Sequence, residues 1–192
     1  MKVMKELFRA LRNHRYDETP SGLYFPNSGF TLQGVFDTQV NDGPVDVFPN
    51  MIVNQWREQA LNILFGSTAK ITTFYLAPFA GNVTPTASWT ASNFASNATE
   101  FTNYTEASRQ TWTVGTVNTS DYSIGNSAAK ATFTVGAGVQ TTIWGVGLLS
   151  AQAKSATSGV LVAANKSAAA RDNLVEGDQI TIGYSIILNN AS

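Results

Sequence analysis

The stretch that most constrains the fold is residues 71–150, in which threonine and serine alternate with apolar and aromatic side chains. Ala131–Val135 and Thr111–Val114 show this alternation, which suits half-buried antiparallel strands because successive side chains of a strand point to opposite faces. Val160–Ala163 and Gln179–Leu188 predict further strands. Residues that favour tight turns interrupt the pattern, among them Gly81, Asn82, Gly125 and Asn126. The sequence therefore predicts a mainly β chain that forms an antiparallel β-sandwich or jelly roll.

Charged residues are sparse along the whole chain. The 192 residues carry a formal net charge of −1, and only 13% of them are charged, which is about half the usual share. A neutral surface gives little electrostatic repulsion between copies, so this composition suits a protein whose surface meets other subunits. Nothing in the charge balance points to a nucleic-acid partner.

The residue inventory narrows the kinds of site that the chain can form. The sequence has no cysteine and a single histidine, His14, which excludes disulfides and argues against a zinc site or a catalytic triad. The absence of cysteine fits assembly in a reducing cytoplasm. No apolar run approaches the ~20 residues of a membrane span, and the charged N-terminus is not typical of a signal peptide. We expect no cofactor, no metal and no membrane partner.

The first 29 residues predict an appendage in front of a body formed by residues 30–192. Residues 1–15 fit a short amphipathic helix that needs support, which could come from its own domain, a neighbouring subunit or an anionic membrane. Residues 17–29 are rich in proline and glycine and indicate either an extended arm or an ordinary loop. The apolar residues of both pieces are the candidate partner-binding residues: Met4, Leu7, Phe8, Leu11, Leu23, Tyr24 and Phe25.

Two local patterns begin the body. Residues 30–48 predict a β-hairpin, because two apolar runs flank the turn cluster Asn41–Pro44. Residues 50–65 carry a broad apolar stripe and predict one helix packed over a face or an end of the sheet. Asn50 is placed to cap the start of this helix, and Gly66 to end it in the left-handed conformation.

Three groups of residues could carry chemistry, and each also has a structural interpretation. Glu100 and Glu106 could flank the cleft of a glycosidase, or they could form surface ion pairs with Arg109. Three carboxylates near the first turn could bind calcium, although their spacing matches no EF-hand loop: Asp37, Asp42 and Asp46. Three tryptophans could stack on sugars or fill the core: Trp89, Trp112 and Trp144. The structural interpretation is favoured in each case, so we expect no enzymatic activity.

Four segments, spread in order through most of the chain, resemble a family of virion structural proteins of tailed bacteriophages, of the head-decoration or capsid-cement kind. These segments are Glu18–Pro26, Phe74–Pro85, Glu100–Arg109 and Trp144–Ser150. The resemblance implies a β-rich body with a helical or extended N-terminal arm. It also implies a place on the capsid surface of the virion, after assembly in the host cytoplasm.

A protein of that kind decorates and stabilises the icosahedral capsid by binding subunits of the major capsid protein. It needs adhesive surface rather than an active site, because several modest contacts multiply affinity when they are linked. A homotrimer on a threefold position presents each contact three times. The alternative that the sequence leaves open is a receptor- or glycan-binding element of a phage fibre or tail.

Overall fold

The computed structural model describes Lys5, Tyr16–Glu18, Gly22, Tyr24–Pro26 and residues 30–190. These residues are mainly β, as the sequence predicts. The chain divides into two compact units, one of residues 1–32 with residues 188–192 and the other of residues 33–187. In the first unit, β1 (Tyr16–Glu18) and β2 (Tyr24–Pro26) form an antiparallel pair.

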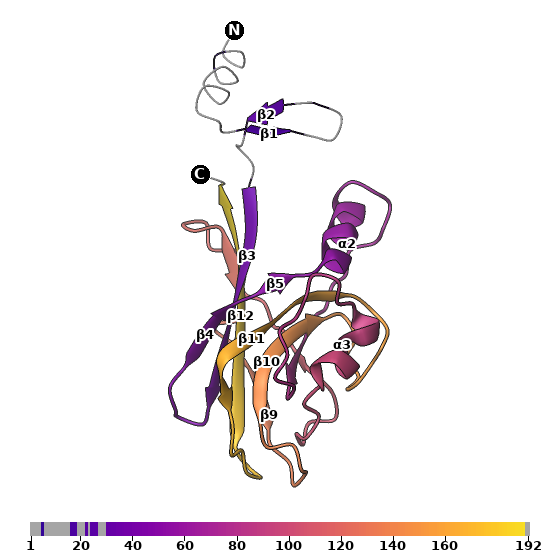
Figure 1. The fold of residues 1–192 in the computed structure, drawn as a ribbon. Coiled ribbons are helices and arrows are strands. Elements are labelled where there is room, and N and C mark those ends of the chain that lie inside the picture. Colours follow the sequence, from indigo (N-terminus) through magenta and orange to yellow (C-terminus); the bar gives the residue numbers. More distant parts are fainter. Residues whose placement is uncertain (1–4, 6–15, 19–21, 23, 27–29, 191–192) are drawn as a thin grey trace. The chain divides into compact units, whose positions relative to one another are not determined.

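The remaining described strands form two five-stranded antiparallel sheets, in agreement with a β-sandwich (Figure 1). The first sheet has the order β5 (Met51–Ile52), β11 (Leu161–Arg171), β10 (Ile143–Leu149), β6 (Tyr75–Phe79) and β7 (Gln110–Thr111). The second has the order β4 (Asp46–Pro49), β3 (Phe30–Val40), β12 (Gln179–Asn190) and β8 (Ser123–Gly125), and β9 (Ala131–Thr134) also pairs with β12. Each sheet mixes early and late strands, so the sandwich closes only when distant parts of the chain meet.

The main core lies between the two sheets and is rich in aromatic rings. Phe36 of β3 and Tyr184 of β12 are almost fully buried, and their ring centroids lie 4.4 Å apart. The ring of Trp112 meets Tyr184 edge-on at 5.5 Å, and its Nε1 donates a hydrogen bond of 2.9 Å to the Tyr184 carbonyl oxygen. Burial of these large rings is a main source of the stability of the sandwich.

A second, smaller core lies on the other side of the first sheet, beneath α3 (Ala91–Ala98). Phe94 of α3 packs edge-on against Phe79 of β6, with 6.2 Å between the ring centroids. The side chain and backbone of Thr90 exchange hydrogen bonds with Asn93 in a capping box that starts the helix. Over this region the sequence predicts only strands and turns, so α3 corrects that prediction. Because α3 is short and rich in serine and asparagine, its cap and its burial define it more than its propensity does.

The predicted hairpin is confirmed. β3 pairs with β4 in antiparallel register, with Val35 opposite Pro49 and Thr38 opposite Asp46. The turn is closed by a hydrogen bond of 2.9 Å from the backbone N–H of Gly43 to the carbonyl oxygen of Val40. The strands predicted near the C-terminal end are also present, as β11 and β12.

The predicted helix is shorter than expected, and both predicted helix-end signals are wrong. The helix is α2 (Asn54–Leu64), and Val53 occupies the N-cap position. The side chain of Asn50 instead accepts a hydrogen bond from the backbone N–H of Gly34 and donates one of 2.6 Å to the Tyr184 hydroxyl. Gly66 does not have the positive φ that a left-handed helix end requires. The C-cap position is instead occupied by Phe65, whose φ is −127°.

Candidate functional site

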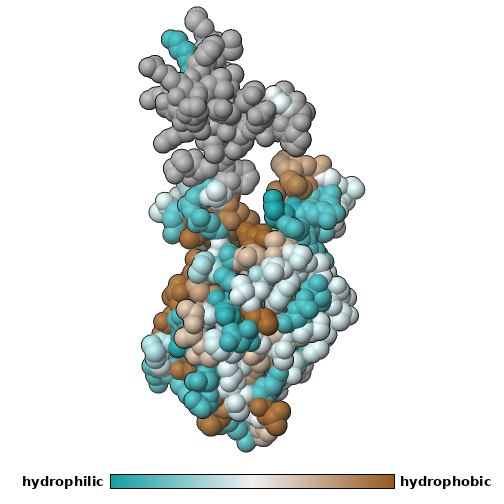
Figure 2. All heavy atoms as spheres, in the orientation of Figure 1, coloured by the Kyte–Doolittle hydropathy of each residue, from teal (hydrophilic) through white to brown (hydrophobic). Residues whose placement is uncertain are grey.

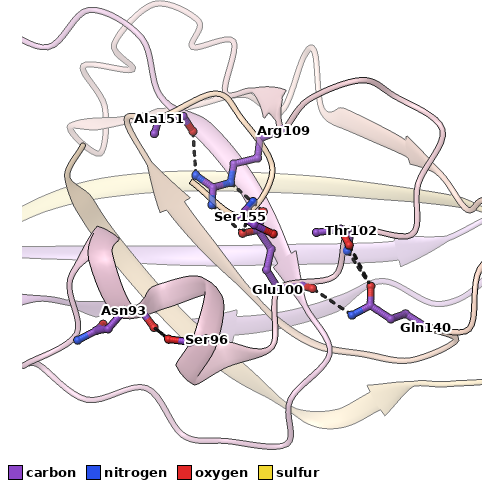
Figure 3. A network of polar contacts seen from close by, with 8 residues as sticks. All are labelled: Asn93, Ser96, Glu100, Thr102, Arg109, Gln140, Ala151 and Ser155. Atoms are coloured by element: carbon purple, nitrogen blue, oxygen red, sulfur yellow. Dashed lines mark hydrogen bonds and ion pairs between the residues drawn. The ribbon is translucent and has the colours of Figure 1, made fainter. Parts of the chain in front are cut away.

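Glu100 lies in a buried ion pair rather than in a cleft (Figure 3). Its Oε1 accepts a hydrogen bond of 2.8 Å from Arg109 Nε, and its Oε2 accepts one of 2.7 Å from Arg109 Nη2. The backbone N–H of Ser155 also donates to Oε2, and Arg109 Nη1 donates to the carbonyl oxygen of Ala151. The sequence predicts a surface ion pair here, which is wrong, because these two side chains are at most 1% exposed. The network joins the segment after α3 to the loop after β10.

Glu106 belongs to a separate set of structural contacts. Both of its carboxylate oxygens accept from the backbone N–H of Thr134 at 3.0 Å. Nearby, Lys154 Nζ donates to the carbonyl oxygens of Thr102 and Tyr104 and lies 3.7 Å from the centre of the Tyr104 ring. Burial lowers the pKa of Lys154 and raises the pKa of the Tyr104 hydroxyl. The carboxylate of each glutamate therefore forms internal hydrogen bonds that fix a neighbouring segment of the chain.

The side chains of the three aspartates near the first turn do not point to a common site. Asp37 pairs with Lys130 at 2.5 Å, whereas Asp46 accepts from the Ser167 hydroxyl and lies 3.9 Å from Arg171 Nη2. Asp42 lies exposed in the hairpin turn. Among the described residues, no group of three or more histidine, cysteine or carboxylate side chains is arranged to hold a metal ion. The recess lined by Thr38, Phe48, Trp144 and Arg171 has no volume that a water molecule could occupy.

Two of the three tryptophans are core residues. Trp89 is 7% exposed and packs on Phe94, and Trp112 is 8% exposed within the main core. Trp144 is half-buried, with Lys166 Nζ 5.2 Å from its ring centre. The structure thus places Trp89 and Trp112 where they cannot stack on a sugar without rearrangement of the core.

Most of the candidate partner-binding residues lie outside the described part of the chain, namely Met4, Leu7, Phe8, Leu11 and Leu23. Tyr24 and Phe25 lie in β2, where Phe25 pairs with Asp17 and Tyr24 with Glu18. The contacts predicted for these seven residues remain predictions.

The prediction of a packed helix is confirmed for the first turn of α2, where Trp56 packs against both cores, but the exposed apolar side chains at the other end of α2 were not predicted. None of its residues is buried. Leu61, Leu64 and the adjacent Phe65 are 60%, 68% and 83% exposed, and we call these three residues the α2 tip. Figure 2 shows hydrophobic surface, in brown, at the free end of α2. Leu61 and Leu64 are three positions apart and share one face of the helix, and Phe65 follows at its C-cap.

The opposite end of α2 is anchored firmly to the sandwich. Val53 is fully buried in the smaller core, and its backbone N–H donates to the carbonyl oxygen of Val162. The side-chain oxygen of Gln55 accepts from the backbone N–H of Ala91 at 2.9 Å and of Leu161 at 2.8 Å. These contacts tie the first turn of α2 to α3 and to β11. The α2 tip is therefore presented on a well-anchored helix.

This arrangement suits adhesion. Burial of exposed leucine and phenylalanine side chains by a partner lowers the free energy by roughly 25 cal/mol per Å² of apolar surface removed from water.

In the described part of the chain, no helix has both the length and the apolar character needed to cross a bilayer. Comparisons with models of known protein families, with characterised proteins and with solved structures find no match to this chain.

Proposed function

We propose that this chain is a non-enzymatic structural protein of a tailed-bacteriophage virion that decorates and cements the icosahedral capsid. In this proposal it binds subunits of the major capsid protein on the outer surface of the shell, as a homotrimer. The phage and capsid assignment rests on the four resembling segments of the sequence.

The observation that carries the adhesive part of the proposal is the α2 tip. Three large apolar side chains, at least 60% exposed, are presented on a helix whose base is fixed by Val53 and Gln55. A rigid apolar surface loses little conformational entropy on binding, so more of its burial energy is available for association. Meanwhile Glu100 and Glu106, the carboxylates considered for catalysis, are engaged in internal hydrogen bonds.

Contact with the shell is assigned to the N-terminal segment, residues 1–29. Its apolar residues Met4, Leu7, Phe8 and Leu11 recur at helical spacing, and Tyr24 and Phe25 follow in the arm. An appendage that docks on a neighbouring subunit extends the contact area beyond the body and raises affinity through effective concentration.

The direct test is electron cryo-microscopy of virions that carry this chain, compared with virions from a phage in which its gene is deleted. We expect repeated density on the outside of the head that is missing from the deletion particles. Chain-free heads should be disrupted at a lower temperature, and adding the purified chain should restore their stability. Density confined to the tail or fibres, or no difference between the particles, would overturn the proposal.

A second experiment tests the N-terminal segment. The full chain and a variant that lacks residues 1–29 are each mixed with chain-free heads, and the bound fraction is measured by co-sedimentation. We expect the truncated variant to lose binding while its circular dichroism spectrum remains that of a folded β protein. Equal binding by both chains would remove the N-terminal segment from the interface.

A further inference from the structure

The exposed apolar side chains of the α2 tip are not accounted for by packing within the described part of the chain. The first turn of α2 is fixed to α3 and β11, whereas Leu61, Leu64 and Phe65 extend from that base largely exposed. Large apolar side chains that gather on an exposed surface are a feature of interaction sites.

The charge around the tip favours a copy of the same chain. Residues 59–69 contain no aspartate, glutamate, lysine or arginine, and the nearest charged residues along the chain are Glu58 and Lys70. A site that recognises a charged protein partner carries complementary charges around its apolar surface. A site that binds a membrane surface carries several basic residues beside its apolar face. A neutral apolar surface can meet an identical surface without burying like charges against each other.

The size of the surface favours three copies rather than two. α2 has 11 residues, which corresponds to a length of roughly 16 Å at about 1.5 Å per residue. One pair of such short helices buries less than the ~800 Å² per partner of a standard interface. In a cyclic trimer, each helix contacts two neighbours, so the buried area of each chain is doubled.

We propose that the α2 tips of three copies of this chain pack against one another around a threefold axis. This inference deepens the proposed function, on which it rests for the trimeric state, by assigning the self-association surface to Leu61, Leu64 and Phe65. Contact with the shell stays assigned, in the proposed function, to residues 1–29.

The absence of cysteine from the chain allows a direct test by disulfide trapping. Phe65→Cys, Leu64→Cys and the control Val139→Cys are each oxidised under mild conditions and run on non-reducing gels. Val139 is 97% exposed in the loop between β9 and β10, which lies at the opposite end of the body from α2 (Figure 1), so it matches the tip residues in accessibility. A disulfide forms only when the two Cα atoms lie within about 7 Å. We expect dimer bands that approach two thirds of the chain for at least one tip variant, and none above background for the control.

The second arm measures mass in solution by analytical ultracentrifugation. The wild-type chain should sediment as a trimer of the 20.6 kDa subunit. The double variant Leu64→Glu/Phe65→Glu places like charges around the axis, so its mass should fall about threefold while its circular dichroism spectrum remains that of a folded β protein. The control Val139→Glu should remain a trimer.

A wild-type chain that is monomeric at virion-like concentrations, or a charged tip variant that remains trimeric, would overturn this inference. So would a trimer that survives the tip variant but is lost when residues 1–29 are removed, because the N-terminal segment would then hold the copies together. None of these results contradicts a position on the head, which the particle imaging tests separately. Conversely, a trimer held by the tip that binds no head would support this inference and refute the proposed function.

Discussion

The carboxylate of Glu100 and the guanidinium of Arg109 meet in a bidentate ion pair that is closed off from solvent, with N–O distances of 2.8 and 2.7 Å. The geometry is of the strong, charge-assisted kind. Through Ala151 and Ser155 the pair also fixes a loop that is distant in sequence. It therefore acts as a joint between two segments that carry no regular secondary structure at that point.

Removal of one partner from this pair should be strongly destabilising. Arg109→Met leaves the Glu100 carboxylate buried without its cation, and we expect the free energy of unfolding to fall by about 3–5 kcal/mol. Urea denaturation monitored by tryptophan fluorescence measures this change. The double variant Glu100→Gln/Arg109→Met, which buries no charge, should be more stable than Arg109→Met alone. A loss below about 1 kcal/mol for Arg109→Met would show that the pair contributes little.

Gly147 is required by the approach of α3 to the first sheet. A Cβ atom at this position would lie 2.5 Å from Cε2 of the Phe94 ring, which is packed in the smaller core. We predict that Gly147→Ala lowers the free energy of unfolding by about 1–3 kcal/mol through overpacking. Gly115→Ala is the matched control, because its Cβ would make only an ordinary contact of 3.6 Å. Equal stability of the two alanine variants would contradict this account.

Asn50 should matter as a link between strands and not as a helix cap. Asn50→Ala removes the hydrogen bonds to the Gly34 backbone and to the Tyr184 hydroxyl, which is buried. We expect a loss of about 1–3 kcal/mol in the free energy of unfolding, because buried polar groups are left without partners. Asn54→Ala, at the exposed start of α2, should change stability by less than about 0.5 kcal/mol. If Asn54→Ala proved the more damaging of the two, the structural role given to Asn50 would be wrong.

Asp178 should contribute a pH-dependent part of the stability. Hydrogen bonds from the Val175 backbone N–H and from the Asn41 side chain lower the pKa of this carboxyl in the folded state. The folded-state pKa then lies below the unfolded value of 3.8, so the stabilisation is fully present above that pH and is lost as the pH falls through the folded-state pKa. Wild-type protein should therefore exceed Asp178→Asn in thermal stability at pH 6 by more than it does at pH 2–3. A difference that stays constant across this range would exclude the linkage.

Local patterns predicted the parts of the fold that depend on near neighbours in sequence. The β3–β4 hairpin follows from the turn cluster Asn41–Pro44 between two alternating runs, and turn chemistry is decided within a few residues. The final strand, β12, was recognisable from its own β-branched alternation. The α3 helix was missed because it is short and half of its eight residues are serine or asparagine, which have weaker helical preference than alanine. The spacing of Thr90 and Asn93 was the one signal that could have indicated its start.

The candidate surface could not be predicted in the same way. The apolar stripe over residues 50–65 marks a helix but does not say which of its turns will be covered, because a core residue and an interface residue look alike in sequence. Glu100 and Arg109 posed the same difficulty, since their spacing fits a surface pair as well as a buried one. The pair is buried by segments distant in sequence, among them the loop of Ala151 and Ser155.

By itself, the sequence determined that this chain forms antiparallel strands with a hydrophobic core, that it carries few charges, and that it lacks cysteine. These properties follow from composition and from short-range periodicity. The tertiary structure decided that Val53 and Gln55 anchor α2 while Leu61, Leu64 and Phe65 remain exposed. The physical reason is that burial depends on which distant segments pack together, here α3 and β11 against the first turn of α2, and that pairing is set by the three-dimensional fold rather than by neighbours along the chain.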